Sequence, residues 1–261
     1  MELADSAFDL PTPELVDLLT NGDMDVEGRM PHSSNATLLV TLWPEGFDRP
    51  EEPEDHDPAN RPLPGSHRAI YKPGQGERPL WDYPGGLYKR EVATYRLAEA
   101  LGWDVIPPTV LTTGPFGEGS VQAFVDGDFA QHYFTLHEEG IGDDDCRAIC
   151  VLDLLANNTD RKSGHCILGR DGRIYGIDNG LTFHAQWKLR TVMWDYVGDP
   201  IPDDLLADVT RFVETGLDDG LCALLDPFEQ DALMTRARAV LDRPFFPDDD
   251  TDGHRWPWPL V

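Results

Sequence analysis

The chain has 261 residues, of which 40% are hydrophobic, and a formal net charge of −27 at pH 7. This length predicts one large or two-lobed body with a sizeable core. The charge disfavours surfaces that approach nucleic acid or an anionic membrane, because both are themselves negative. No apolar run reaches the roughly 18 residues that span a bilayer, and the first residues lack a signal-peptide pattern. We therefore expect a cytoplasmic protein with no nucleic-acid partner and no stable membrane association.

The four cysteines lack CxxC spacing and are too few for a disulfide scaffold in a chain of this length. Cys146 and Cys150 are one helical turn apart and Cys166 follows His165, so a zinc site is one alternative. Buried, reduced thiols are the favoured interpretation.

The first part of the chain predicts a short helix followed by extended structure. Thr12 has the character of an N-cap, and Gly22 ends the helix. Alternating apolar residues around the turn sequence PHSSN predict a hairpin over about 23–43. The acidic, proline-rich stretch 46–67 has too little apolar content to pack, so we expect a mobile loop there.

A strand, HRAIYKP, is expected to end at Lys72 and Pro73, and a helix follows from about Leu87. One apolar stripe of this helix includes Glu91, and a carboxylate on an inner face needs a partner. The sequences VIPPTVLTT and GSVQAFV are strand-like and close the first half near Val125. A β-rich lobe is therefore predicted over 1–125.

The second half, 126–261, is mainly helical in pattern. A buried helix is expected from Asp143 to Asn157, followed by the polar loop NNTDRKSGHCIL and a hairpin that turns at 169–172. The patterns DDLLADVTRFVETG and PFEQDALMTRARAVLDRP predict two further helices. The aromatic segment RWPWPLV at 255–261 is expected to dock on the body of the protein or on a partner.

The predicted hairpin brings two candidate metal ligands together. With Leu168 opposite Arg173, His165 lies opposite Gly176 with Asp178 on its diagonal, close enough for both side chains to reach one ion. Asp160 precedes the hairpin and can face the same cleft. One group that positions a nucleophile and two that hold a divalent metal are the parts that phosphoryl transfer needs.

The first half supplies complementary parts. Lys72 and Glu91 can form the ion pair that directs an ammonium group at nucleotide phosphates. The turn that contains Ser33, Ser34 and Asn35 can cover the phosphates with amides and hydroxyls. Each feature alone is more often an ordinary surface group or turn. Their order along the chain makes them informative.

Three segments, KREVATYRLAEALGWDVIPPTVL, NNTDRKSGHCIL and YGIDNGLTF, resemble the phosphatidylinositol 3- and 4-kinase superfamily. The similarity is greatest to type II phosphatidylinositol 4-kinases and to a bacterial group classed with them, and HipA-type kinases are more distant. It covers about 28–183. The resemblance implies an α+β, two-lobed, atypical protein-kinase-like fold with a β-rich N-lobe and a mainly helical C-lobe.

The resemblance also implies roles for individual residues. Lys72 would contact ATP phosphates with Glu91 as its partner, Asp160 would be the catalytic aspartate, and Asp178 the main metal ligand. The segment that contains Gln122, Phe124 and Val125 would be the hinge beside adenine, which its backbone groups would recognise.

One position departs from the family pattern, which places a metal-binding asparagine where this chain has His165. A neutral imidazole prefers softer metals than magnesium, so Mg or Mn, a single-metal mechanism and impaired catalysis stay open. We expect an ATP-dependent phosphotransferase that acts on a protein or a soluble small-molecule hydroxyl. The alternatives are a nucleotide-binding pseudokinase or scaffold, and an AMP transferase on the same fold.

Overall fold

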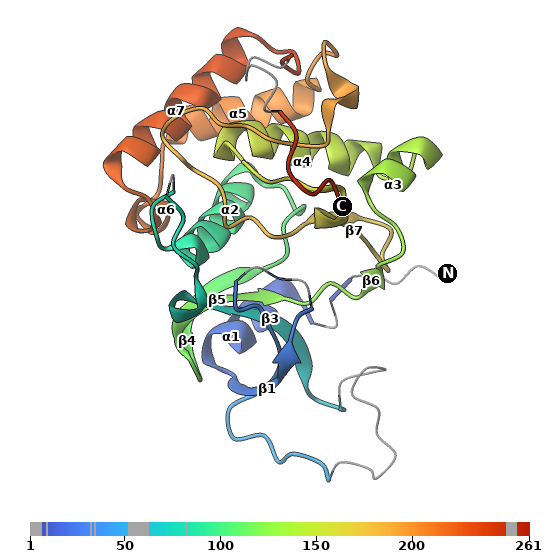
Figure 1. Ribbon diagram of the computed structural model, residues 1–261, viewed down its shortest axis with the longest axis vertical. Helices are drawn as coiled ribbons and strands as arrows, with labels where there is room; N and C mark the ends of the chain where they lie inside the picture. The colour runs from blue at the N-terminus through green and yellow to red at the C-terminus, as the bar shows by residue number, and fades with distance from the viewer. Residues whose placement is uncertain are drawn as a thin grey trace. The chain divides into compact units, whose positions relative to one another are not determined.

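The computed structural model describes residues 7–8, 10–31, 33, 35–51, 63–81, 83–248 and 255–261. The chain divides into two compact units (Figure 1). The sheet unit comprises 8–92 and 108–124, and the helical unit comprises Ala7, 93–107 and 125–261, in each case as far as these residues are described. The expected boundary at 125 is one residue from the last division, but 93–107 belong with the second half of the chain. Most of the expected mobile loop, 52–62, lies outside the described residues.

The sheet unit is built on five antiparallel strands in the order β1-β2-β3-β5-β4. The β1–β2 pairing confirms the hairpin predicted over 23–43. The elements are α1 (Thr12–Asn21), β1 (Asp23–Arg29), β2 (Leu38–Trp43), β3 (His67–Pro73), the 3₁₀ turn η1 (Gly74–Gly76), β4 (Thr109–Gly114) and β5 (Gly117–Ala123).

Alternate side chains along β3 point to opposite faces of the sheet. Ala69 and Tyr71 are buried in a cluster with the leucines of α1 and with strand residues such as Val121. Successive strand side chains point to opposite faces, so Lys72 lies on the other face. Helix α1 begins at Thr12, with Pro11 at the cap position and no side-chain capping bond, so the prediction that Thr12 is the N-cap was wrong by one residue.

The helical unit contains most of the helices and a small sheet of order β6-β7-β8. Helix α2 begins in the sheet unit and belongs to the helical unit from Ala93. The elements are α2 (Leu87–Leu101), β6 (Gly127–Asp128), α3 (Tyr133–Glu139), α4 (Asp143–Ala156), η2 (Ser163–His165), β7 (Cys166–Gly169), β8 (Ile174–Gly176), η3 (Trp194–Tyr196), α5 (Asp203–Thr215), α6 (Asp219–Leu224) and α7 (Pro227–Asp242).

Helix α4 forms the centre of the helical unit. Its predicted inner residues Ile149, Leu152 and Leu155 are fully buried, in one cluster with residues of α5 and α7. The predicted helices α4, α5 and α7 are confirmed, whereas α3 and α6 were not predicted from the sequence. These two helices have only 7 and 6 residues, too few to produce a clear apolar period.

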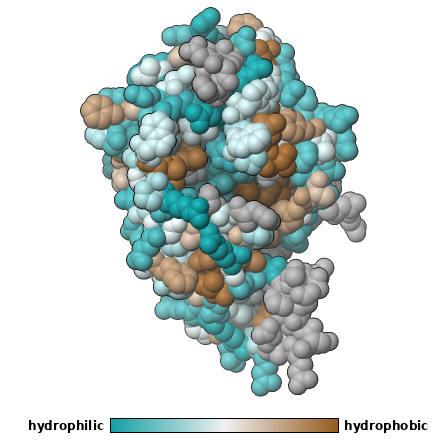
Figure 2. All heavy atoms as spheres, viewed as in Figure 1, coloured by the Kyte–Doolittle hydropathy of each residue, from teal (hydrophilic) through white to brown (hydrophobic). Residues whose placement is uncertain are grey.

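The drawn face of the molecule is mainly hydrophilic (Figure 2). On the face drawn in Figure 2, hydrophilic residues surround smaller hydrophobic patches. Among the described helices, none combines the length and the apolar character that crossing a membrane requires.

Candidate functional site

The loop that follows α4 is polar in sequence but buried in the structure. Helix α4 ends at Asn157, which adopts a left-handed backbone with φ of 52°. Asn158, Arg161 and Ser163 are almost completely excluded from solvent. Buried polar groups are tolerated where hydrogen bonds satisfy them, so the loop depends on its internal contacts.

Arg161 is the centre of these contacts. Its guanidinium group donates to both carboxylate oxygens of Asp153 on α4, at 2.8 and 2.9 Å. It also donates to the carbonyl oxygen of Ile177 at 2.8 Å and to Oδ1 of Asn179 at 2.7 Å. Burial alone would lower the pKa of Arg161, but the attraction of Asp153 outweighs it and the pKa is raised. A permanently charged guanidinium therefore joins α4, the loop and the end of β8.

Asp160 lies next to this frame and is only partly buried. Its amide donates to Oδ1 of Asn158 at 2.9 Å, and its carboxylate accepts a hydrogen bond from the ammonium group of Lys162. Burial raises the pKa of Asp160, while the bond and charge of Lys162 oppose this effect. Asp160 is thus a carboxylate with increased basicity and a cation beside it.

His165 and Asp178 meet as the sequence predicted. The His165 Nε2 atom lies 3.4 Å from Asp178 Oδ2, and the side chains are 14% and 51% exposed. The predicted register was wrong by one residue, because Leu168 pairs with Ile174 and Cys166 with Gly176.

The two side chains still converge because the backbone turns after β8. Asp178 has a φ of 56°, in the left-handed region that aspartate and asparagine adopt more readily than most residues. The amide of Ile177 donates to the His165 carbonyl oxygen at 2.9 Å, which places the two segments side by side.

The imidazole orientation of His165 bears on metal binding. Its Nδ1 atom accepts a long hydrogen bond of 3.5 Å from the Lys162 amide. In a neutral ring this leaves the proton on Nε2, where it faces Asp178. Coordination of a metal ion through Nε2 therefore requires the proton to move from Nε2 to Nδ1. This breaks the long hydrogen bond that Nδ1 accepts from the Lys162 amide.

In the sheet unit the structure brings Lys72 and Glu91 together. The ammonium group of Lys72 on β3 donates to the Glu91 carboxylate on α2, so the predicted ion pair is present. Glu91 is 4% exposed and Lys72 18% exposed. Their role toward ATP stays a prediction.

The predicted phosphate-covering turn is only partly described, since Ser34 lies outside the described residues. The Ser33 hydroxyl donates to the Met30 carbonyl oxygen at 2.9 Å. The side-chain oxygen of Asn35 accepts the amide of Arg78 at 2.9 Å. The structure thus ties Ser33 and Asn35 into local contacts, and their role toward phosphate stays a prediction.

The predicted hinge coincides with a division between the units, which falls between Phe124 and Val125. The Gln122 side chain donates to the Thr109 hydroxyl at 2.9 Å. The amide of Ala123 donates to the Pro108 carbonyl oxygen at 2.8 Å, and that of Phe124 to Arg68 at 3.2 Å. These two amides are therefore already engaged within the sheet unit. Recognition of adenine by this segment remains a prediction.

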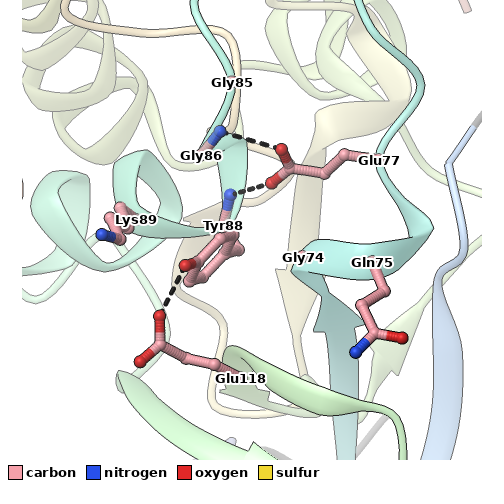
Figure 3. Close-up of a pocket in the computed structure, with 8 residues that line it drawn as sticks. All are labelled: Gly74, Gln75, Glu77, Gly85, Gly86, Tyr88, Lys89 and Glu118. Atoms are coloured by element: carbon pink, nitrogen blue, oxygen red, sulfur yellow. Dashed lines mark hydrogen bonds between the residues drawn. The ribbon is translucent and has the colours of Figure 1, made fainter.

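A polar recess of about 560 Å³ lies beside the start of α2 (Figure 3). The Glu77 carboxylate accepts the amides of Gly86 and Tyr88 at 2.9 and 2.7 Å, and the Tyr88 hydroxyl donates to Glu118 at 2.5 Å. Burial, with the negative charge of Glu118, raises the pKa of Tyr88 to about 12. Glu77 thus satisfies amides at the start of the helix that carries Glu91.

The zinc alternative gains no support from the described residues, which contain no group of three or more histidine, cysteine or acidic side chains placed to hold a metal ion. Cys146, Cys150 and Cys166 are buried free thiols, and burial raises the pKa of each. These thiols are protonated at neutral pH.

Three residues of this region were not predicted from the sequence: Lys162, which contacts Asp160, and Asp153 and Asn179, which contact Arg161. Asp153 did leave a signal, because it interrupts the apolar run CVLDLLA of α4. A carboxylate on a buried face requires a cation. No sequence signal indicated that Lys162 would be paired, because a lysine in a loop is usually solvated.

Comparison with known structures identifies the fold of this chain. The Golgi casein kinase structure with Mn/ADP bound matches with a TM-score of 0.53 at 13% identity, covering 96% of this chain and 80% of that one. The structure of hydra Fam20 with sugar matches with a TM-score of 0.52 at 12% identity, covering 92% and 89%. These similarities confirm the atypical kinase-like fold, whereas the more specific resemblance to phosphatidylinositol kinases stays a prediction.

No family model matches the chain. Protein Rv2133c of Mycobacterium tuberculosis (strain ATCC 25618 / H37Rv) is 34% identical over 280 residues of alignment, which cover 93% of this chain and 94% of that protein. Because the similarity extends over almost the whole of both proteins, the chain belongs to the family of Rv2133c.

Proposed function

We propose that this protein is an ATP-dependent phosphotransferase that modifies a hydroxyl group. The observation that carries the proposal is the contact of His165 with Asp178 in a kinase-like fold. Asp160, five residues before His165, forms an ion pair with Lys162. Carboxylates that position a nucleophile and hold a divalent metal are the groups that phosphoryl transfer uses.

Asp160 would orient the acceptor hydroxyl and accept its proton. Its raised pKa makes it a stronger base than an exposed aspartate. Lys162 partly opposes the rise in the pKa of Asp160, and its ammonium can offset negative charge on the transferring phosphoryl group.

The residues fit a divalent metal that takes most of its ligands from water and phosphate. One carboxylate and one imidazole suit Mn²⁺, whereas Mg²⁺ prefers oxygen donors. Asp178 and His165 would hold the ion, which would neutralise charge on the phosphates of bound ATP. That the Golgi casein kinase structure holds Mn and ADP supports testing manganese first.

The sheet unit would supply Lys72 as a contact to the ATP phosphates. Its pairing with Glu91 fixes the ammonium on the face of the sheet opposite the core. Ser33, Ser34, Asn35 and the hinge residues Gln122, Phe124 and Val125 complete the proposed nucleotide-binding set.

A protein or a soluble metabolite is the proposed acceptor. The net charge of −27 opposes approach to anionic lipid. Phosphatidylinositol in vesicles is nevertheless a useful acceptor to test, because labelling of this lipid would support the resemblance to phosphatidylinositol kinases.

The test uses ATP labelled at the α- or the γ-phosphate, with Mn²⁺ or Mg²⁺, and compares the protein with Asp178→Asn. Asparagine tolerates the left-handed backbone at this position, so the substitution removes charge without adding strain. We expect γ-label transfer or ATP turnover, reduced about 10²-fold or more in the variant. The exposed Asp204→Asn is the matched control and should retain full activity.

Each result selects one function. Transfer of the α-label indicates AMP transfer, and ATP binding without turnover indicates a pseudokinase in which His165 only donates a hydrogen bond to Asp178. Equal turnover in Asp178→Asn and the unmodified protein would contradict the assignment of Asp178.

A further inference from the structure

The aromatic segment Arg255–Val261 lies against the loop that carries the candidate catalytic groups. It is the dark red stretch that ends at the label C beside β7 in Figure 1. The Ser163 amide donates to the Leu260 carbonyl oxygen at 2.8 Å. Ser163 begins η2, which ends at His165. The segment therefore contacts the loop midway between Asp160 and His165.

The other end of the segment is anchored to the chain around Thr191. The Arg255 carbonyl oxygen accepts the Thr191 amide at 3.0 Å and the Trp194 indole N–H at 3.3 Å. The Arg255 guanidinium lies over the rings of Trp194 and Trp256, with centroid distances of 5.5 and 5.2 Å. Such cation–π contacts stabilise by about 0.5–2 kcal/mol.

The two regions that the segment contacts, around Ser163 and around Thr191, both adjoin Arg161. The stretch around Thr191 forms a parallel bridge with Arg161, in which the Arg161 amide and carbonyl bond to Arg190 and Val192, each at 3.1 Å. The segment thus joins two stretches of chain that both flank the buried guanidinium.

The loop needs such outside support because its own contacts leave one group unsatisfied. Ser163 is 0% exposed, and among the described residues its hydroxyl has no hydrogen-bond partner. A buried hydroxyl without a partner costs about 1–3 kcal/mol. This conformation of the loop is therefore held partly by contacts from elsewhere, of which the Leu260 carbonyl is one.

We propose that Arg255–Val261 is a positioning strap for the candidate active site. By holding Ser163 it fixes the turn in which the His165 amide donates to the Lys162 carbonyl oxygen at 3.1 Å. That turn places His165 against Asp178 and Lys162 against Asp160. The consequence for catalysis rests on the proposed function, whereas the consequence for loop order does not.

The test removes 255–261, which includes the Leu260 carbonyl, and compares this variant with Val261→Ala, which keeps it. We expect the deletion to accelerate amide hydrogen exchange in 159–168 and to raise the Mn²⁺ concentration that gives half-maximal ATP turnover. The synthetic peptide RWPWPLV, added to the deletion variant, should slow the exchange again and restore turnover. Val261→Ala should resemble the unmodified protein in both measurements.

A second variant protects the test against misfolding of the deletion. Arg255→Ala removes the stacking on Trp194 but keeps the chain length, and should accelerate exchange in the same loop to a smaller extent. Unchanged exchange in both variants would overturn the proposal. Turnover that increases on deletion and falls when the peptide is added would also overturn it, since the segment would then be inhibitory.

The two proposals fail separately. If the unmodified protein does not turn over ATP while the deletion still accelerates exchange, the proposed function is wrong and the strap stands. If turnover is normal and exchange is unaffected by deletion, the strap is wrong and the function stands.

Discussion

Each of the two units contains an ion pair with a buried carboxylate, and the two pairs differ in solvent access. In the helical unit Asp153 and Arg161 are 2% and 0% exposed, and the guanidinium uses both carboxylate oxygens. In the sheet unit Glu91 is buried to a similar degree, but Lys72 remains 18% exposed.

This difference in exposure suits Arg161 to a structural role and leaves Lys72 accessible to a ligand. The donors of Arg161 are directed to atoms of α4, the loop and the end of β8, so the residue is suited to hold these segments together. The ammonium of Lys72 donates to the buried Glu91 carboxylate and retains access to solvent, as a phosphate-binding group must. Under the proposed function, solvent exposure rather than charge distinguishes the structural role of Arg161 from the ligand-binding role proposed for Lys72.

The largest effect should come from breaking the pair in the helical unit. Asp153→Asn leaves the Arg161 charge buried without a carboxylate, and such losses cost about 3–5 kcal/mol. We expect the free energy of unfolding in urea to fall by about this amount. The control is Asp126→Asn, which breaks the exposed pair with Arg170 and should cost no more than about 1 kcal/mol. Equal losses in the two variants would show that burial does not make the Asp153–Arg161 pair more important to stability than an exposed pair.

A smaller loss is expected in the sheet unit. Glu91→Gln preserves shape but removes the charge that pairs with Lys72, and hydrogen bonds to charged groups contribute about 1.5–3 kcal/mol. The KM for ATP should increase in the same variant, because the ammonium is no longer held in place. Glu99→Gln, on the exposed side of the same helix, is the control and should leave the KM unchanged. An unaltered KM in Glu91→Gln would argue against a role for Lys72 toward ATP.

Contacts that follow from the spacing of apolar, charged and glycine residues could be predicted from the sequence. An acidic residue in an apolar stripe predicted the Lys72–Glu91 pair, and a glycine-flanked turn predicted that His165 and Asp178 would meet. The pairing register was wrong by one residue, and Asp178 reaches His165 through a left-handed backbone that no alternation rule predicts.

What the sequence did not reveal depends on tertiary burial. NNTDRKSGHCIL has the composition of an exposed loop, and only the folded structure shows that Asp153 and main-chain carbonyls satisfy Arg161 inside the protein. The same limitation applies to Lys162, whose partner is two residues away. Local propensity does not indicate whether such a lysine is solvated or held.

The position of Lys72 can also be disturbed from the neighbouring strand. Gly119 on β5 lies so close to β3 that an added Cβ would overlap the Lys72 carbonyl oxygen. Gly119→Ala should therefore cost about 1–3 kcal/mol, as overpacking does, and should raise the KM for ATP. At Gly28 an added Cβ would meet nothing within 4 Å, so Gly28→Ala is the control. A Gly119→Ala variant as stable as Gly28→Ala would show that the sheet accommodates the methyl group.

The smallest effect on stability concerns Asp160 and depends on pH. Burial raises the pKa of this carboxyl above its ordinary value of 3.8, against the opposing effect of Lys162, so the folded protein favours the protonated form. Below pH 3.8 the group is protonated in both states, and as pH rises through the folded pKa its ionisation opposes folding. Asp160→Asn is uncharged throughout, so it should become slightly more stable than the unmodified protein between acidic and neutral pH, while turnover falls by about 10²–10⁴-fold. Urea unfolding at several pH values measures the difference, with the exposed Asp204→Asn as the control substitution. A variant that loses stability as pH rises would indicate that Lys162, rather than burial, dominates the environment of Asp160.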